Sequence, residues 1–283
     1  MRLITILLLI AVLTSCSIAQ DSLHAVPAEH AESFSGRKIL ATGLVGGFLA
    51  GSLVDAYYAW WKGASNPFTF RAEGWFNGSS LGIDKAGHIY TSYFYFHAVR
   101  DVMIWGGYDP STASWWGAGL SGFFAISIEI GDGLSEYAFD YQDLLCNFAG
   151  LGYAVLQTKS PFFRNFNLKW GYVPRDGYRF PPHFTDHYDA HTYWITANVH
   201  ELLPPSLKAY WPEFLQVGVG YGVDDRITKR EMVVGLDLNL EVFSVHNEEI
   251  SLAQKIVNMF HVPAPAAKFT ERKVPRYYLF QRD

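Results

Sequence analysis

Acidic residues and one histidine stand at the ends of apolar segments, where they could carry out chemistry. Asp84 and His88 lie one helical turn apart at the start of a predicted helix. Glu129 and Asp132 end a second apolar segment, and Asp143 opens a third. A carboxylate in such surroundings must be neutral, paired or hydrogen-bonded, because an isolated buried charge is very costly. We therefore expect these five residues to meet in one polar cluster.

The predicted cluster has two interpretations, and Lys85 and Asn147 are expected beside it in both. If His88 and two carboxylates act as metal ligands or proton carriers, the cluster is a metal-assisted or acid–base catalytic site. Alternatively, the same groups form a knot of hydrogen bonds and ion pairs that fixes how the helices pack. Asp84 could also simply cap its helix. The sequence favours the packing knot and leaves the catalytic site as its alternative.

Small residues at intervals of about four predict how these groups are positioned. The ladders are Gly43, Gly47 and Gly51, followed by Asp55; Ala113, Gly117, Ser121 and Ala125, followed by Glu129; and Asp143, Asn147, Gly150 and Ala154. Small residues at this spacing let helix backbones approach closely. Each ladder therefore predicts a face where one helix contacts another. The carboxylates of Asp55 and Glu129 are then expected to point into the helix junctions.

A weaker candidate for metal binding lies later in the chain. His183, His187 and His191 have the spacing that would place three imidazoles on one face of a helix. Pro181 and Pro182 precede them, however, and the segment has the composition of a surface loop. No phosphate-cradling glycine motif or nucleophile elbow occurs, so we expect no cofactor.

Hydropathy patterns predict an α+β fold in which a Gly-rich helical bundle is followed by a mixed region with a small antiparallel sheet. Residues 39–160 form the predicted helical core, with apolar or helical segments at Ile39–Trp61, Lys85–Trp105, Ala113–Ile130 and Tyr141–Gln157. Residues 161–283 form the mixed region. It contains a predicted hairpin of Leu215–Val223 and Met232–Val242, an amphipathic helix over Glu248–Phe260, and a last strand over Tyr277–Phe280.

The first residues predict export from a bacterial cell. Residues 1–20 have the form of a signal peptide, with an apolar run over Leu3–Leu13 that is too short to cross a bilayer. Small residues before Cys16 predict a lipoprotein signal in which this cysteine receives the lipid. A rival cut after residues 17–19 would give ordinary secretion. Residues 21–38 are polar and predict a tether.

Composition narrows the partners that this protein could bind. Its formal net charge of −5 provides no basic field for nucleic acid. If Cys16 carries lipid, Cys146 is the remaining cysteine and no disulfide can form. The expected partners are membrane lipid and other envelope proteins. Whether the apolar helices are buried in a compact domain or span a membrane stays open, as does the choice between inner and outer membrane.

Three blocks carry a resemblance to a known family. They are Asp84-Lys85-Ala86-Gly87-His88, Ile128-Glu129-Ile130-Gly131-Asp132-Gly133 and Asp143–Gly150. In this order they resemble the YfiM-like family of predicted periplasmic lipoproteins, a domain of unknown function. Longer family members resemble this chain as far as Ala266. The resemblance implies a location in the cell envelope, facing the periplasm, and supplies no catalytic assignment.

The order of these motifs is also distantly similar to that of VanZ-like membrane proteins. The chain departs from them at Gly131, near where those proteins carry glutamine. The function preferred on sequence alone is therefore a structural or interaction role at the membrane. Its alternative is a membrane-facing hydrolase or transferase that acts on lipid-linked envelope material through the polar cluster. Passage of small solutes is a third class and would require true membrane spans.

Overall fold

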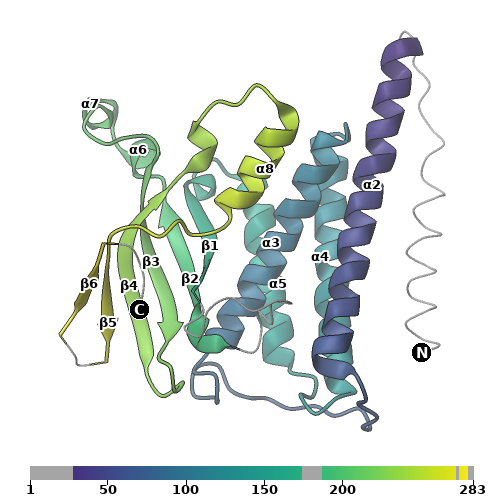
Figure 1. The fold of residues 1–283 in the computed structure, drawn as a ribbon, viewed down its shortest axis with the longest axis vertical. Coiled ribbons are helices and arrows are strands. Elements are labelled where there is room, and N and C mark those ends of the chain that lie inside the picture. The colour runs from purple at the N-terminus through teal and green to yellow at the C-terminus, as the bar shows by residue number, and fades with distance from the viewer. Residues whose placement is uncertain (1–27, 174–186, 272–273, 280–283) are drawn as a thin grey trace.

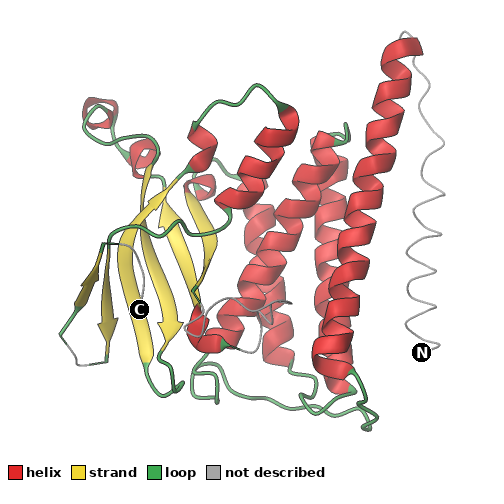
Figure 2. Cartoon of the chain, viewed as in Figure 1, coloured by secondary structure: helices red, strands yellow, loops and turns green. Residues whose placement is uncertain are grey.

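The computed structural model describes residues 28–173, 187–271 and 274–279. In this part of the chain a bundle of long helices packs beside an antiparallel sheet (Figure 1), which confirms the predicted α+β class. The long helices and the strands occupy separate halves of the molecule (Figure 2). The predicted signal peptide, its candidate lipidation site Cys16, and His183 lie outside the described residues.

The long helices of the described residues form the bundle. They are α2 (Ala28–Ala56), extended by a π-helical turn (Tyr57–Trp61), α3 (Ile83–Trp105), α4 (Pro110–Gly133) and α5 (Tyr141–Lys159). Helix α3 packs against α2, α4 and α5. The predicted helices are confirmed, with ends that differ by a few residues. Helix α2 begins earlier than expected, so residues 28–38 of the predicted tether are helical.

Aspartate caps determine where two of these helices begin. The Asp109 carboxylate accepts hydrogen bonds from the backbone N–H groups of Ser111 and Thr112 and so starts α4. The Asp140 carboxylate accepts one from the N–H group of Gln142 and starts α5. This second cap matters for the site, because it holds the first turn of α5 beside the first turn of α3.

The sheet contains six antiparallel strands among the described residues, in the order β1 to β6. Their bounds are β1 (Phe166–Tyr172), β2 (His191–Ala197), β3 (Leu215–Val223), β4 (Arg230–Leu238), β5 (Ala266–Thr270) and β6 (Arg276–Tyr278). The predicted hairpin is β3–β4, but its second strand ends at Leu238. Short helices and 3-10 turns connect or flank the strands. The helices are α6 (Val199–Leu202), α7 (Pro205–Lys208) and α8 (Glu248–Asn258), and the turns are at Phe163–Asn165, Tyr188–Ala190 and Leu240–Val242.

The β3–β4 hairpin buries its small and polar face. A Cβ atom added to Gly220 would lie 2.9 Å from the ring of Trp194, so the indole occupies the space that side chains on β3 would otherwise fill. The apolar side chains of Val219 and Val234 point the other way and keep 44% and 43% of their surface exposed. This arrangement is the reverse of a sheet that places its apolar face on the core.

A buried ion pair lies on this inner face. The Lys169 ammonium group is 2.7 Å from Asp237 Oδ2, and neither side chain is exposed. Lys169 also donates a hydrogen bond to the carbonyl oxygen of Leu238. The Asp237 carboxylate accepts a hydrogen bond from the backbone N–H group of Val262 and lies 3.2 Å from His261 Nδ1. These contacts connect β1, β4 and the segment before β5.

Two of the predicted small-residue ladders are helix contact faces. Gly117 on α4 lies against the carbonyl oxygen of Phe96 on α3, and a Cβ atom at this position would come within 2.7 Å of it. The contact at Gly150 on α5 is closer still. A Cβ atom there would lie 1.9 Å from the carbonyl oxygen of Ile89. Cys146, in the same part of α5, is buried and free, as expected for a small core residue.

The third ladder, on α2, was predicted wrongly. Cβ atoms added to Gly43, Gly47 or Gly51 would meet nothing within 4 Å, and Asp55 is exposed. Helix α2 instead turns Ala41, Val45, Leu49 and Ala56 toward the bundle. A ladder of small residues permits a close approach without requiring one, and here the glycines face open space.

The contact at Gly150 gives a direct test of the bundle. Replacing Gly150→Ala is expected to lower the free energy of unfolding by about 3 kcal/mol, because the new methyl group overlaps the backbone of α3. The matched change Gly152→Ala meets open space in the same helix, so we expect it to be neutral or to stabilise by up to ~1 kcal/mol. Urea unfolding followed by circular dichroism measures both. Equal effects would contradict the packing described here.

Candidate functional site

The residues that were predicted to meet do so where α3 and α5 begin and α4 ends. We refer to them as the polar cluster: Asp84, Lys85 and His88 from α3, Glu129 and Asp132 from α4, and Asp143 and Asn147 from α5. The close crossings at Gly117 and Gly150 bring these helix ends together. Glu129 has only 1% of its surface exposed.

The imidazole of His88 lies between carboxylates. Its Nε2 atom is 3.6 Å from Asp84 Oδ1 and 3.7 Å from Asp143 Oδ1. On the other side of the ring, Nδ1 is 3.8 Å from Glu129 Oε1. Burial disfavours the charged ring, but the charges of Asp84, Asp143 and Glu129 outweigh it and raise the pKa of His88.

Asn147 orients the ring of His88. The Ser92 hydroxyl group donates a 2.8 Å hydrogen bond to Asn147 Oδ1, which leaves the amide N–H groups facing the cluster. The amide nitrogen lies 3.1 Å from His88 Nδ1 and 3.5 Å from Glu129 Oε1. With this amide orientation His88 Nδ1 accepts a hydrogen bond, so the neutral ring carries its proton on Nε2.

Lys85 neutralises much of the negative charge on the other side of the cluster. Its ammonium group is 2.5 Å from Asp143, 3.1 Å from Asp140 and 3.6 Å from Asp84. Burial opposes its charge, but these carboxylates outweigh that effect and raise the pKa of Lys85. For Asp140 burial is likewise outweighed, by backbone N–H groups and by Lys85, so its pKa is lowered.

The two acidic residues of α4 have perturbed pKa values. Burial raises the pKa of Glu129 to about 8, and the neighbouring Asp143 and Asp132 carboxylates add to that shift. Burial also raises the pKa of Asp132 to about 6, although the Trp61 indole N–H donates a 2.7 Å hydrogen bond to it. Glu129 therefore holds a proton at neutral pH, while Lys85 and Asp140 are charged.

The polar cluster forms one wall of a cavity of about 580 Å³. Asp84, His88 and Asp143 supply polar groups to it. Apolar and aromatic side chains also line the cavity: Phe48 and Trp60 from α2 and its extension, Tyr95 from α3, and Phe124 and Ile128 from α4. The open glycines of α2, Gly47 and Gly51, leave room on that side. Asp55 lines the cavity as well and does not point into a helix junction as predicted.

His187 and His191, the two described residues of the second candidate metal site, do not share a helix. The described chain runs from His187 into a 3-10 turn and then into strand β2, which begins at His191. The helical spacing of these two residues therefore does not place them on one face. His191 is buried, accepts a hydrogen bond from the indole N–H of Trp170, and lines the cavity of the polar cluster.

Three atoms of the polar cluster are close enough to share one cation. A ligand atom from each of Asp84, His88 and Asp143 lies within 4.8 Å of the others. The ammonium group of Lys85 already contacts both carboxylates and supplies the positive charge that they require. The chemistry of this donor set therefore favours proton transfer over metal coordination.

Two residues of the site were missed from the sequence. Asp140 was overlooked because it precedes its helix, although an aspartate before a helix start is a recognisable cap signal. Tyr188 donates a hydrogen bond of 3.1 Å from its hydroxyl group to Asp84 Oδ1. No local sequence signal connects Tyr188, in the turn before β2, to a carboxylate on α3.

Fold and site define a class of α+β protein whose helical bundle carries a buried acidic and histidine cluster beside a cavity. Residues 72–159, which include the whole polar cluster, match the family described as predicted periplasmic lipoprotein (DUF2279). The predicted resemblance is confirmed over this segment, and the protein is an exported, periplasm-facing, membrane-associated protein of the cell envelope. Neither the curated proteins nor the solved structures contain a significant match.

The raised pKa of Glu129 predicts a pH-dependent stability. Between pH 5 and 8 the unfolded chain has already released this proton while the folded protein keeps it, so stability falls as pH rises. His88, whose folded pKa is also raised, contributes in the same direction. Glu129→Gln replaces the ionisable carboxyl group with a neutral amide of the same shape. It should raise the free energy of unfolding at pH 8 by about 2 kcal/mol relative to the unmodified protein.

Thermal and urea unfolding at several pH values measure this effect. Glu136→Gln, at an exposed position just after α4, serves as the matched control and should leave the slope with pH unchanged. If Glu129→Gln kept the slope of the unmodified protein, Glu129 would not be the group that holds the proton.

Proposed function

We propose that this envelope protein is a membrane-facing hydrolase or transferase that acts on lipid-linked material through the polar cluster. The observation that carries the proposal is the position of His88, which lines the cavity with carboxylates on both sides of its ring. A cluster that served only to fix helix packing would be closed, with each group satisfied by its neighbours. An open wall of perturbed acid and base groups is instead typical of a catalytic site.

The geometry supports a concerted proton transfer. In the proposed reaction, the Asp84 carboxylate accepts the proton of an attacking hydroxyl group as its oxygen bonds to the ester centre. The bond to the leaving oxygen breaks, and His88 Nε2 supplies the proton that this oxygen needs. Asp84, now protonated and 3.6 Å from Nε2, then returns its proton to the ring, so that both groups regain their starting state. Water as the attacking group gives hydrolysis, and an acceptor alcohol gives transfer.

The cavity walls support an amphipathic substrate. Its polar wall holds the cluster and Arg71, while Phe48 and Phe124 present aromatic surface across the same space. An ester headgroup would occupy the polar part and a hydrocarbon chain the aromatic part. Helix α2 contributes to this wall through Phe48 and carries further exposed apolar side chains at Leu44 and Val54, so a hydrocarbon chain in the cavity would lie close to an apolar outer surface.

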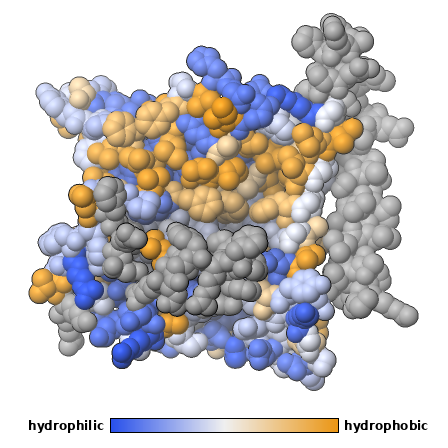
Figure 3. All heavy atoms as spheres, viewed as in Figure 1, coloured by the Kyte–Doolittle hydropathy of each residue, from blue (hydrophilic) through white to orange (hydrophobic). Residues whose placement is uncertain are grey.

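The outer surface of the molecule supports a position at the membrane. Gly36–Trp61 is the one stretch of the described helices that is long and apolar enough to cross a bilayer, with a mean hydropathy of 1.6. Only 22% of that apolar window is buried. Figure 3 shows an apolar band that crosses the visible face over both sheet and helices, with hydrophilic residues above and below it. A lipid surface would cover such a band.

The role of His88 can be tested by activity measurements. The lipidated protein in mixed micelles is offered chromogenic carboxylic and phosphate esters with short or long alkyl chains. We expect hydrolysis of a long-chain ester that exceeds that of its short-chain counterpart. His88→Ala should lower the rate by at least about 100-fold, because the proton donor of the leaving group is lost.

His246→Ala provides the control, since this histidine is exposed and lies in a loop before α8. Its rate should equal that of the unmodified protein. Equal rates for both variants, or no hydrolysis of any long-chain ester, would favour the alternative that the cluster serves packing alone.

Membrane contact through α2 can be separated from the lipid anchor. A Cys16→Ala variant should still float with vesicles of phosphatidylethanolamine and phosphatidylglycerol, because the exposed face of α2 binds lipid. Adding Ile39→Ser, Leu40→Ser and Leu44→Ser should release it. Adding Tyr210→Ser, at an 83% exposed position beyond α7, should not. Release of the single variant Cys16→Ala would show that lipidation alone provides attachment.

A further inference from the structure

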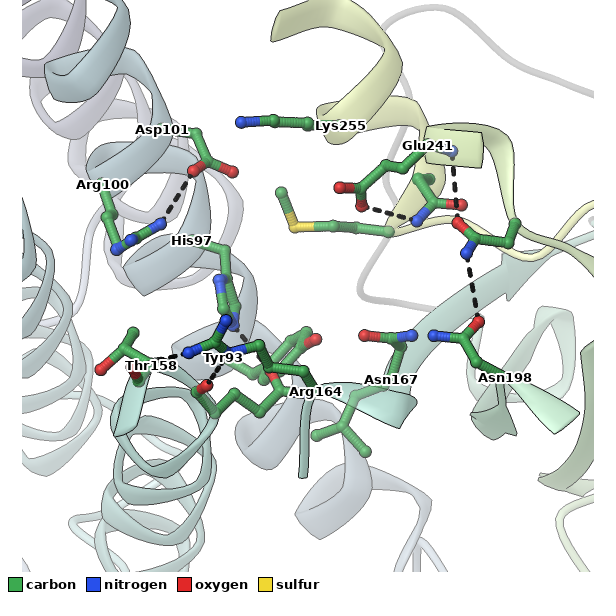
Figure 4. Close-up of a pocket in the computed structure, with 15 residues that line it drawn as sticks. Tyr93, His97, Arg100, Asp101, Thr158, Arg164, Asn167, Asn198, Glu241 and Lys255 are labelled. Carbon is green, nitrogen blue, oxygen red and sulfur yellow. Dashed lines mark hydrogen bonds and ion pairs between the residues drawn. The ribbon is translucent and has the colours of Figure 1, made fainter. Parts of the chain in front are cut away.

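A second cavity lies away from the polar cluster, where the bundle meets the sheet. Its volume is about 350 Å³, within the range of small-molecule sites, roughly 300–1,000 Å³. The second half of α3, the end of α5, the start of β1 and helix α8 surround it (Figure 4). The two cavities share no lining residue, and on α3 the polar cluster occupies the first turns whereas this cavity is lined from Tyr93 onward.

Charged groups of both signs line this cavity. The carboxylates are Asp101 and Glu241, and the cations are Arg100, Arg164 and Lys255, which leaves one positive charge in excess. His97 adds none, because burial lowers its pKa to about 4 and the ring is neutral. A ligand that carries one negative charge would balance the site.

Two of the cations, Arg164 and Lys255, have no carboxylate partner among the described residues. The Arg164 guanidinium donates hydrogen bonds to the backbone carbonyl oxygens of Gln157 and Thr158 and forms no ion pair with a described carboxylate. Lys255 likewise forms no ion pair within the described residues, although its charge acts on Asp101, which Arg100 contacts at 3.2 Å. Figure 4 shows Lys255 at the edge of the open space, with Arg164 on another side of it.

Amide side chains supply the remaining polar surface. Asn258 donates a 2.8 Å hydrogen bond to Glu241, which orients that carboxylate. Asn198 accepts a hydrogen bond from Asn239, so both are held in place. The Asn167 amide, from β1, lies beside the same space in Figure 4 and forms no side-chain hydrogen bond within the described residues. The cavity therefore offers donors and acceptors side by side.

This mixture selects the chemistry of the ligand. A hydroxyl group both donates and accepts, so a ring with several hydroxyl groups can satisfy neighbouring amides, carboxylates and ammonium groups at once. A hydrocarbon would leave these groups without hydrogen-bond partners, which disfavours its binding. A simple anion would use the cations but leave Glu241 and Asp101 facing its charge. From these observations we infer that the cavity binds an acidic sugar: a saccharide ring with one carboxylate.

Calorimetric titration of the full-length lipidated protein in detergent tests this inference with matched probes. N-acetylmuramic acid carries the ring and a carboxylate, N-acetylglucosamine carries the ring alone, and lactate carries the carboxylate alone. We expect N-acetylmuramic acid to bind at least about tenfold more tightly than either of the others. It should also raise the melting temperature, because ligand bound between bundle and sheet stabilises their junction.

Variants establish where the sugar binds. Lys255→Met should weaken N-acetylmuramic acid about tenfold and remove its advantage over the neutral sugar, while Asn167→Ala should weaken both sugars. Lys208→Met, on α7 and paired with Glu201, is the control and should bind as the unmodified protein does. Circular dichroism of each variant without ligand verifies that it is folded.

Three results would overturn the inference. They are the absence of binding by either sugar, equal binding of lactate and N-acetylmuramic acid, and unchanged binding by folded Lys255→Met and Asn167→Ala. None of them depends on the catalytic proposal, because His88→Ala leaves this cavity intact and is expected to bind the sugar normally.

Discussion

Helix α5 passes α3 so closely at Gly150 that a methyl group there would overlap the carbonyl oxygen of Ile89. This backbone contact sets the register between the two helices. Because Asn147 and Asp143 precede Gly150 on the same face of α5, and His88 immediately precedes Ile89 on α3, the contact also fixes which side chains meet. The position of the site is thus a consequence of packing, and its groups need no flexible loop to bring them together.

Much of the site could be predicted because buried charge is costly. Carboxylates at the ends of apolar segments had to find partners, and the ladders of α4 and α5 predicted which faces would touch. The prediction that the α2 ladder is a helix contact face was wrong, because it relied on the small size of glycine alone. Glycine makes a close approach possible, but neighbouring large residues decide whether it occurs, and α2 packs through Val45 and Leu49.

Other parts of the structure depend on contacts that no local pattern encodes. Tyr188 reaches Asp84 across a long stretch of sequence. The strict alternation in β3 and β4 predicted the strands correctly but could not show which face is buried, because Trp194 lies in a different strand and fills the space over Gly220. The contacts of Lys85 were likewise predictable only in part. Lys85 was expected near the cluster, whereas its contact with the cap residue Asp140 required the three-dimensional arrangement.

The buried pair of Lys169 and Asp237 has a consequence for how the sheet assembles. These residues belong to β1 and β4, which are separated by β2 and β3 in the sheet and by a long stretch of sequence. If β1 and β2 closed first, the Lys169 ammonium group would lose water without gaining its counter-ion, at a cost of several kcal/mol. Partial sheets are therefore penalised. We expect β1 to β4 to form as one cooperative unit, so that in a newly exported chain the sheet closes only when β4 has joined it.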